Sequence, residues 1–279
     1  MNKNLKEKLI FSLFGAVTAL VVLVTVAILV FIIFRGIGQI SWDFISKAPE
    51  NGMMEGGIFP AIMGTLLLIT GSCVLAFPIG VLSGIFMNEY AHENAFKRIV
   101  TMMTSNLAGI PSIVFGLFGL ALFVNFFKMG VSLMAGCCTL AILVLPVIIR
   151  TTEEALKQID DTYRFSGYAL GTSKFKTVFG IILPMAMPNI ITGLILSIGR
   201  VAGETAPIIF TVAAYYLSEI SFSLQSPVMA LPYHLYVMAT SGIDLEKSRS
   251  IAFGTALILM SIVLIMNLLV GGVKRFYSK

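Results

Sequence analysis

One stretch decides how this chain folds: FGIILPMAMPNIITGLILSIGRVAGETAPIIFTVAAYYLS, residues 179–218, is apolar and carries only two charged side chains, Arg200 and Glu204. A charge inside hydrocarbon costs roughly 2.5–3.5 kcal/mol on insertion scales. Four residues apart on a helix, the two side chains lie on one face and within reach of each other. We therefore expect an ion pair that faces a protein interior or a water-filled path. The pair either lines a path for an ion or substrate, or is a purely structural buried salt bridge.

The whole chain has the composition of a membrane protein. Of its 279 residues 57% are hydrophobic and only 12% are charged, whereas soluble domains carry about 25% charged residues. Cys73, Cys137 and Cys138 lie in apolar runs, which favours core residues over a disulfide framework. The histidines, His92 and His234, are far apart and have no cysteine partners nearby. The sequence therefore predicts no metal site, no cofactor and no catalytic residue.

Six segments are long and apolar enough to cross a bilayer, which requires about 20 residues. The predicted transmembrane helices cover residues 11–34, 58–87, 109–127, 129–149, 189–217 and 250–273. We expect an all-α, polytopic membrane protein with a single transmembrane domain over residues 1–279. The first segment is longer than the apolar core of a signal peptide and has no good cleavage site, so it is interpreted as a retained helix.

Lys and Arg are distributed unevenly between the two sides of this topology. With the N-terminus in the cytoplasm, thirteen of the 19 Lys and Arg residues lie inside, five lie outside and Arg200 lies in the membrane. Because cytoplasmic loops carry an excess of Lys and Arg, both termini are predicted to be cytoplasmic. The net charge of +5 then needs no nucleic-acid partner.

Two pairs of small residues, Gly80 with Gly84 and Gly199 with Gly203, are spaced one helical turn apart. Such pairs let helix backbones approach closely in a membrane, and ordinary packing is the simplest interpretation. Close packing of the second pair would also hold Arg200 away from lipid. The charged segment 89–104, which begins with Glu89, is most simply a solvated face.

The long connection over residues 150–188 is predicted to be a helix–turn–helix exposed to the cytosol. Good helix formers run from Glu153 to about Tyr168, and Lys174 begins the next helix. Gly171 suits the turn, because glycine adopts the left-handed conformation cheaply. The segment is either a connector or a docking element for a cytoplasmic partner. The chain lacks a phosphate-binding G-x-x-x-x-G-K-[ST] motif, so any nucleotide site lies on another chain.

This connection resembles a motif of ABC importer permeases, E-A-A-x-x-x-G followed by I-x-L-P. ALG at 169–171 and IILP at 181–184 match its second half, whereas FSG stands at 165–167 in place of Glu-Ala-Ala. The departure puts a specific glutamate contact with an ATPase in doubt. It leaves intact the geometry of a short helix that ends in glycine.

Four further strings narrow the resemblance to phosphate-specific ABC importer permeases of the PstA type. They are AGIPSIVFGLF at 108–118, IRTTE at 149–153, YALGT at 168–172 and RVAGETAP at 200–207. The resemblance runs from about Arg35 to the C-terminal region, and RVAGETAP is its most specific part.

The resemblance implies a type I, MetI-like permease architecture for a transport subunit that is not an enzyme, in the plasma membrane of a bacterium or archaeon. It implies as partners a sister permease of the PstC type in a heterodimer, two copies of a cytoplasmic ATPase of the PstB type, an extracytoplasmic phosphate-binding protein of the PstS type, inorganic phosphate and membrane lipid. The segment that would couple to the ATPase consists of Tyr163, Arg164, Phe165, Ser166, Gly167, Tyr168, Ala169, Leu170 and Gly171.

Arg200, Glu204 and Thr205 are predicted to line the phosphate path. The planar fork of Arg200 matches phosphate oxygens in pairs. Glu204 would serve as its partner when phosphate is absent and would repel phosphate that stays, and Thr205 would donate its hydroxyl. Pro207 removes one backbone hydrogen bond and is expected to kink the span near Gly203.

Other functions stay open from the residues alone. One alternative is a permease of the same fold that carries molybdate or another oxyanion instead of phosphate. An ion-coupled secondary transporter needs its own ion site and often an inverted repeat, and no repeat is seen. A membrane-embedded enzyme needs a nucleophile, an acid–base pair or a metal cluster, which two separated histidines and one buried carboxylate do not supply.

Overall fold

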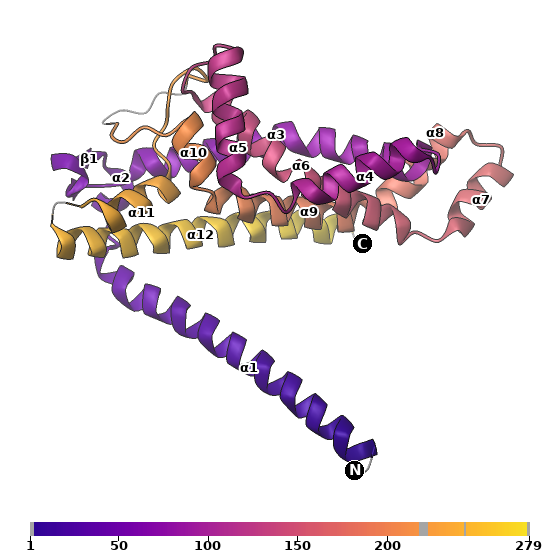
Figure 1. The fold of residues 1–279 in the computed structure, drawn as a ribbon, viewed down its shortest axis with the longest axis horizontal. Helices are drawn as coiled ribbons and strands as arrows, with labels where there is room; N and C mark the ends of the chain where they lie inside the picture. The colour runs from indigo at the N-terminus through magenta and orange to yellow at the C-terminus, as the bar shows by residue number, and fades with distance from the viewer. Residues whose placement is uncertain (1–2, 218–222, 243, 278–279) are drawn as a thin grey trace.

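The structure is a computed structural model that describes residues 3–217, 223–242 and 244–277, most of them in helices (Figure 1). The α-helices are α1 (Lys3–Gly36), α2 (Trp42–Ser46), α3 (Phe59–Ile85), α4 (Ala95–Leu107), α5 (Ser112–Gly119), α6 (Leu133–Lys157), α7 (Asp161–Ala169), α8 (Lys174–Thr177), α9 (Leu183–Gly203), α10 (Ala206–Thr211), α11 (Leu231–Thr240) and α12 (Leu245–Tyr277). Shorter helical turns are η1 (Ile37–Gln39), η2 (Asn51–Met53), η3 (Phe86–Tyr90), η4 (Leu120–Phe126) and η5 (Val178–Ile182). Strands β1 (Pro49–Glu50) and β2 (Glu55–Gly56) pair antiparallel, with Pro49 opposite Gly56.

The helices have the length and composition of membrane spans. Five qualify by themselves: Ile10–Gln39, Phe59–Tyr90, Leu133–Lys157, Lys174–Gly203 and Leu245–Arg275. The pair Ala95–Leu107 and Ser112–Phe126 passes the same test together, although its two parts are bent by 105°. The chain is thus an all-α, polytopic membrane protein, with up to six spans in the part that the structure describes.

The bent pair differs from the single span predicted at 109–127. Pro111 has the extended dihedrals φ −56° and ψ 137°, and a proline has no N–H to continue a preceding helix. The chain therefore turns over residues 108–111, and α5 stands nearly upright on the bundle in Figure 1 while α4 lies along it.

The span predicted at 189–217 also differs from the structure. The helix already begins at Lys174 and passes through the π-helical turn η5 into α9. Such a local π adjustment re-satisfies backbone groups that a proline frees, and Pro184 and Pro188 follow directly. At the other end the helix stops at Gly203, because Glu204 is extended with ψ 128°, and the short helix α10 follows.

Helices α3, α6 and α9 pack against one another and form the core. A Cβ atom on Gly80 would lie 2.6 Å from Ile148 Cγ2, and one on Gly84 would lie 2.6 Å from Thr152 Cβ. The first glycine pair therefore marks a close approach between α3 and α6, as its spacing predicted. The long helix α12 lies along α9 and α11 and closes one side of the bundle (Figure 1).

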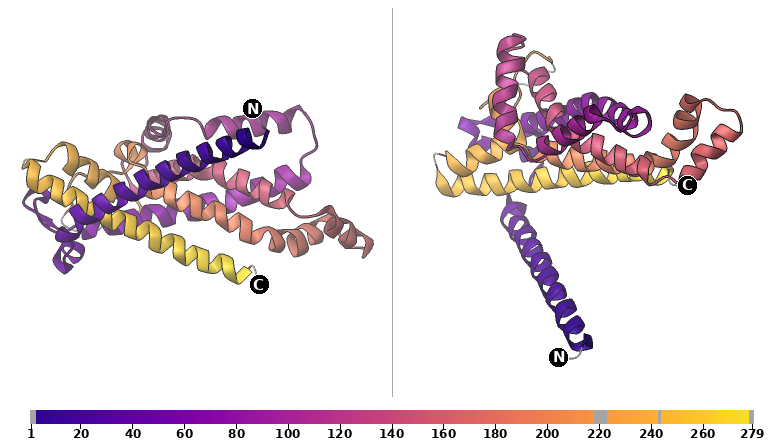
Figure 2. Two further views of the ribbon diagram at one scale, coloured as in Figure 1. Left: turned by 90° about the horizontal axis from the view of Figure 1, so that it is seen from below. Right: turned by 45° about the vertical axis from the view of Figure 1, so that its right-hand side comes forward.

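Helix α1 leaves the bundle at an angle, as Figure 1 and the right-hand view of Figure 2 show. Its contacts with the bundle are mainly with α12, where the rings of Phe31 and Phe253 meet edge to face with centroids 5.5 Å apart. Most large apolar side chains of α1 from Ile10 onward are exposed. A helix that is apolar all round needs lipid or another protein around it.

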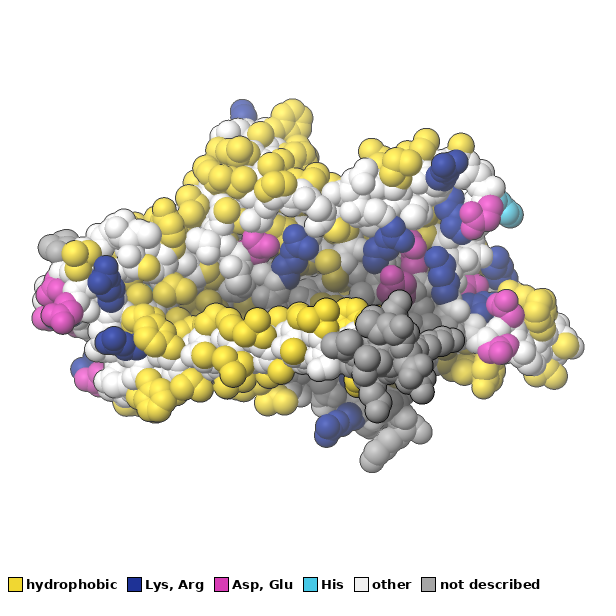
Figure 3. All heavy atoms as spheres, turned by 60° about the horizontal axis from the view of Figure 1, so that its bottom comes forward, with side chains coloured by type: hydrophobic (Ala, Val, Ile, Leu, Met, Phe, Trp, Pro, Cys, Tyr) yellow, Lys and Arg dark blue, Asp and Glu magenta, His cyan; other side chains and the backbone are white. Residues whose placement is uncertain are grey.

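Charged side chains gather at the two ends of the bundle, and the middle is mostly apolar (Figure 3). The richer cluster of Lys, Arg, Asp and Glu lies at the end that carries α7 and α8. Such a division is expected for a molecule whose middle lies in hydrocarbon and whose ends are in water.

Candidate functional site

Arg200 and Glu204 form the predicted ion pair at the end of α9. Arg200 lies in the last turn of the helix and Glu204 directly follows it. The distance from Arg200 Nε to Glu204 Oε1 is 3.5 Å, and the two side chains are 29% and 15% exposed, respectively. The pair is therefore neither sealed in the core nor fully solvated. A cation in the last turn is also favoured by the negative end of the helix dipole.

The face of α9 beside this pair is uncovered. A Cβ atom on Gly199 or on Gly203 would meet no atom of the described chain within 4 Å. The close packing that we expected for this second glycine pair is therefore not made within the described chain. The two small residues instead leave open space on both sides of Arg200.

The helix break next to Glu204 is stabilised by packing of α10. Thr205 precedes α10, and its hydroxyl does not cap that helix. Pro207 is buried in the first turn of α10, where a proline costs no hydrogen bond. Gly116 of α5 allows this approach, because a Cβ atom there would lie 2.9 Å from Pro207 Cα. Thr205 is thus held beside the ion pair by a well-packed element.

The predicted coupling segment forms a compact unit, α7 and α8, at one end of the bundle. The sequence predicted one helix from Glu153 to Tyr168, but α6 ends at Lys157 and a new helix begins at Asp161. Asp160 causes this division, since its carboxylate accepts a hydrogen bond from Thr162 N at 2.8 Å and so caps α7. Hydrogen bonds with the side chain and the backbone N–H of Thr162 also lower the pKa of Asp160.

The turn of this unit lies where the sequence placed it. Gly171 has φ 77°, and α7 ends two residues earlier at Ala169. Around the turn, Phe165 is 69% and Leu170 is 82% exposed, and Tyr163 and Tyr168 are also exposed. Ser166 and Ala169 lie at the exposed surface as well, whereas Gly167 is buried. The unit therefore presents apolar and aromatic side chains to its surroundings.

Arg164, on the same helix, turns inward and binds a residue that the sequence did not single out. Its Nη2 atom is 2.6 Å from Glu89 Oε1, and the two side chains are 13% and 5% exposed, respectively. The hydrogen bond with Glu89 raises the pKa of the Arg164 guanidinium. Glu89 is therefore not part of a solvated face as its sequence neighbourhood suggested. Its partner lies 75 positions away, and no local spacing signals such a pair.

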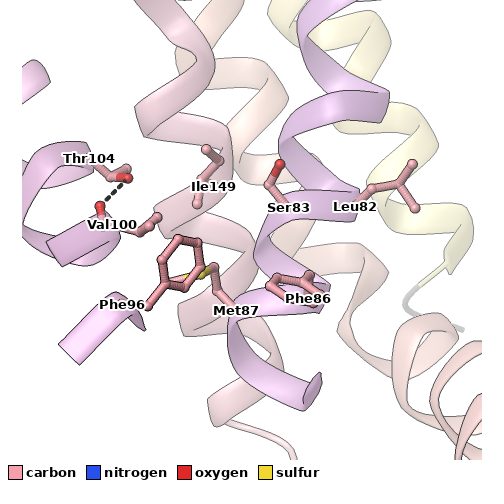
Figure 4. Close-up of a pocket in the computed structure, with 8 residues that line it drawn as sticks. All are labelled: Leu82, Ser83, Phe86, Met87, Phe96, Val100, Thr104 and Ile149. Atoms are coloured by element: carbon pink, nitrogen blue, oxygen red, sulfur yellow. Dashed lines mark hydrogen bonds between the residues drawn. The ribbon is translucent and has the colours of Figure 1, made fainter. Parts of the chain in front are cut away.

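A hollow of about 400 Å³ lies between α3, α4 and α6, and Arg200 is not one of the residues that line it. Figure 4 shows its lining from the three helices and the hydrogen bond from Thr104 Oγ1 to the Val100 carbonyl, 2.8 Å long. The lining residues are Leu82, Ser83, Phe86, Met87, Phe96, Val100, Thr104 and Ile149. Because they carry no charge, this hollow offers little to an oxyanion.

Metal chemistry finds no support in the part of the chain that the structure describes. Within residues 3–217, 223–242 and 244–277, His, Cys, Asp and Glu side chains do not gather in groups of three that could hold a metal ion. Cys73, Cys137 and Cys138 are free thiols, the first two of them buried. The candidate site is the Arg200–Glu204 pair, in which a guanidinium and a carboxylate lie beside open space.

Comparison with known proteins agrees with the geometry. The family model of the binding-protein-dependent transport system inner membrane component matches residues 76–279. A probable ABC transporter permease protein, YqgI, from Bacillus subtilis (strain 168) is 32% identical over 96% of this chain and 95% of its own length. The phosphate transport system permease protein PstA from Pasteurella multocida (strain Pm70) is 33% identical over 86% of this chain and 84% of its own. PstA from Mycobacterium leprae (strain TN) is 37% identical over 82% and 73%, respectively.

Solved structures share the fold at low sequence identity. A chain of the alginate importer, a bacterial ABC transporter, superposes with a TM-score of 0.68 at 14% identity and covers 99% of both chains. A chain of the inward-facing MetNI methionine ABC transporter gives a TM-score of 0.61 at 17% identity and covers 80% of this chain and 95% of its own. Both likenesses concern the architecture alone. Together with the family match and the relatives, they show that this chain belongs to the binding-protein-dependent transport system inner membrane components, as a MetI-like permease subunit of an ABC importer.

Proposed function

We propose that this permease imports inorganic phosphate and that Arg200, Glu204 and Thr205 line the phosphate path beside a sister permease. The observation that carries the proposal is the partly exposed ion pair at the end of α9, beside the open space that the described chain leaves at Gly199 and Gly203. A membrane-embedded charge pair that stays accessible in one subunit is suited to a path that the second subunit completes. The relatives named as phosphate transport permeases support phosphate as the cargo.

The geometry of the pair suits transient binding. A guanidinium offers a planar fork of donors that matches two oxygens of a phosphate, and it stays charged when water is removed. At 3.5 Å the contact with Glu204 is longer than a strong charged hydrogen bond of about 2.7–2.9 Å. An entering phosphate can therefore take over the guanidinium. The Glu204 carboxylate repels the anion and favours its release.

The energy for transport comes from partner chains. In this proposal the chain pairs with a sister permease of the PstC type, two ATPases of the PstB type and a phosphate-binding protein of the PstS type. The unit α7–α8 docks on an ATPase through exposed apolar side chains that include Phe165 and Leu170. Aromatic side chains are enriched in protein interfaces, where a few residues that become buried supply most of the binding energy. Both termini then lie in the cytoplasm.

Replacement of Arg200 tests the proposed path. In proteoliposomes that hold the complete complex, Arg200→Gln should lower ATP-dependent phosphate uptake at least about tenfold, because a hydrogen bond to a charged group contributes roughly 1.5–3 kcal/mol. Arg249→Gln, a change at an exposed arginine of α12, serves as the matched control and should leave uptake unchanged. The amount of assembled complex should be equal in both variants.

The same assay separates the alternatives. Normal phosphate uptake by Arg200→Gln would contradict the path role. Uptake of molybdate in preference to phosphate by the unchanged complex would keep the permease and change its cargo. Transport by the purified chain without any ATPase would favour an ion-coupled secondary transporter.

A further inference from the structure

The guanidinium of Arg164 joins three elements at one end of the bundle. Its Nη2 and Nε atoms bond the carboxylate of Glu89 in η3, the continuation of α3, at 2.6 and 3.3 Å. Its Nη2 atom also donates to the Leu156 carbonyl at 3.0 Å, and Nη1 donates to the Ile159 carbonyl at 2.8 Å. Leu156 lies in the last turn of α6 and Ile159 lies two residues beyond its end. One side chain of α7 is thus bonded to the ends of both α3 and α6.

The second arm of the α7–α8 unit meets the same end of α3. Lys174, the first residue of α8, places its Nζ atom 5.0 Å from the centre of the Tyr90 ring, which is within the range of a cation–π contact. Tyr90 follows Glu89 directly and packs against the core. Two successive residues of η3 therefore hold both arms of the unit.

The unit itself is closed by a short set of contacts between its arms. Thr172 donates its hydroxyl to the Gly167 carbonyl at 2.8 Å, and its oxygen lies 2.7 Å from the hydroxyl of Thr177. Gly167 admits this arrangement, because a Cβ atom there would lie 2.8 Å from Thr177 Cγ2. Because these contacts hold α7 and α8 together, a force applied to either helix moves both.

We propose that Arg164 is the positioning residue through which displacement of the α7–α8 unit moves α3 and α6 together. The inference rests on the proposed docking of this unit on an ATPase. It adds the contacts through which displacement of the unit reaches α3 and α6. The forked, nearly buried bond to Glu89 resists both bending and sliding, unlike a single exposed ion pair. Because α3 and α6 pack along α9, the motion continues to the helix that carries Arg200.

Glu89→Gln tests this route with little change in shape. The variant keeps an acceptor for Arg164 but removes the charge that makes the bond strong. In proteoliposomes with the sister permease, ATPase and binding protein, we expect the phosphate imported per ATP hydrolysed to fall roughly fivefold or more, the scale of an allosteric coupling. Arg164→Lys, which keeps the charge but loses the fork, should lower the same ratio.

Glu93→Gln is the matched control. Glu93 forms a pair of similar length with Lys97, 2.7 Å, but its side chain is almost fully exposed and joins no second helix. Loss of that pair should leave the ratio of phosphate to ATP at the level of the unchanged complex.

Each result of this experiment supports or contradicts a stated proposal. Assembled complexes of Glu89→Gln or Arg164→Lys that hydrolyse ATP but import little phosphate support the route. Assembled complexes of both variants with the normal ratio contradict it. If both variants fail to assemble, the pair is a brace needed for folding, which also contradicts it. A complex with unchanged sequence that imports no phosphate at all would instead contradict the proposed cargo.

Discussion

His234 is a buried titratable side chain on α11, a helix outside the candidate membrane spans. Its Nδ1 atom lies 3.1 Å from the hydroxyl oxygen of Thr255 on α12. Burial lowers the pKa of His234 to about 4. The folded chain therefore keeps this imidazole neutral under conditions in which an unfolded chain would protonate it.

The folded protein should consequently lose stability in mild acid. Between pH 6.5 and about 4 the unfolded chain binds a proton that the folded chain does not, so the free energy of unfolding falls as the pH falls. For His234 the loss amounts to about 2 kcal/mol at pH 5 relative to pH 7. His234→Gln, which keeps a polar partner for Thr255, should reduce the difference between the thermal midpoints at the two pH values. His92→Gln, at an exposed histidine, should retain it; equal pH dependence in all three proteins would rule out this role.

The sequence allowed us to predict a charge pair between residues close together in the chain, but not one between residues far apart in it. Arg200 and Glu204 are four positions apart in an apolar run, and their pairing follows from the spacing, whereas the end of α9 at Gly203 was predicted only as a kink. Arg164 and Glu89 are 75 positions apart, so only the tertiary fold brings them together. Glu89 also sits in a segment with several charges, which hides a buried carboxylate among solvated ones.

The two glycine pairs have identical spacing but different surroundings. Gly80 and Gly84 of α3 face α6 at close range, whereas Gly199 and Gly203 of α9 face open space. Spacing alone indicates that a helix can be approached closely. It does not tell whether the approaching helix belongs to the same chain.

Gly80→Ala should therefore destabilise the bundle. Its new methyl group would lie 2.6 Å from Ile148 Cγ2, and overpacking of this kind costs typically about 1–3 kcal/mol. The midpoint of thermal unfolding in detergent should fall accordingly. Gly15→Ala is the matched control, because a Cβ atom at that position of α1 meets nothing within 4 Å. A midpoint for Gly80→Ala equal to that of the control would mean that α3 and α6 can separate at no cost.

Helix boundaries were predictable only where one residue dictates the backbone. Gly171, with its positive φ, lies at the turn that the sequence predicted. The helix start at Lys174 was predicted too, but its continuation into α9 as one span was not, because Pro184 and Pro188 suggested an interruption that η5 absorbs. The 105° angle between α4 and α5 depends on the packing of α5 against α10, which no local pattern encodes.

At the scale of the whole molecule, composition fixed the class and the number of spans far better than their arrangement. An apolar chain with few charges has to satisfy its backbone in helices, and that constraint yields an all-α bundle without further detail. The course of α1 away from the bundle (Figure 1) could not be predicted. Its apolar side chains suit lipid, a neighbouring subunit or the rest of the bundle equally well, so the sequence does not indicate which of them α1 contacts.

The orientation of the bundle is the remaining prediction at this scale. Thirteen of the 19 Lys and Arg residues fall on the side of the termini, and this excess places that side in the cytoplasm. We expect His92→Cys, at an exposed site between η3 and α4, to react with a membrane-impermeant maleimide only after cells are permeabilised. Lys47→Cys, at an exposed site before β1, should react in intact cells. The unchanged chain, with Cys73 and Cys137 buried, gives the background. The reverse pattern of labelling would invert the topology and would place the α7–α8 unit on the side away from any cytoplasmic ATPase.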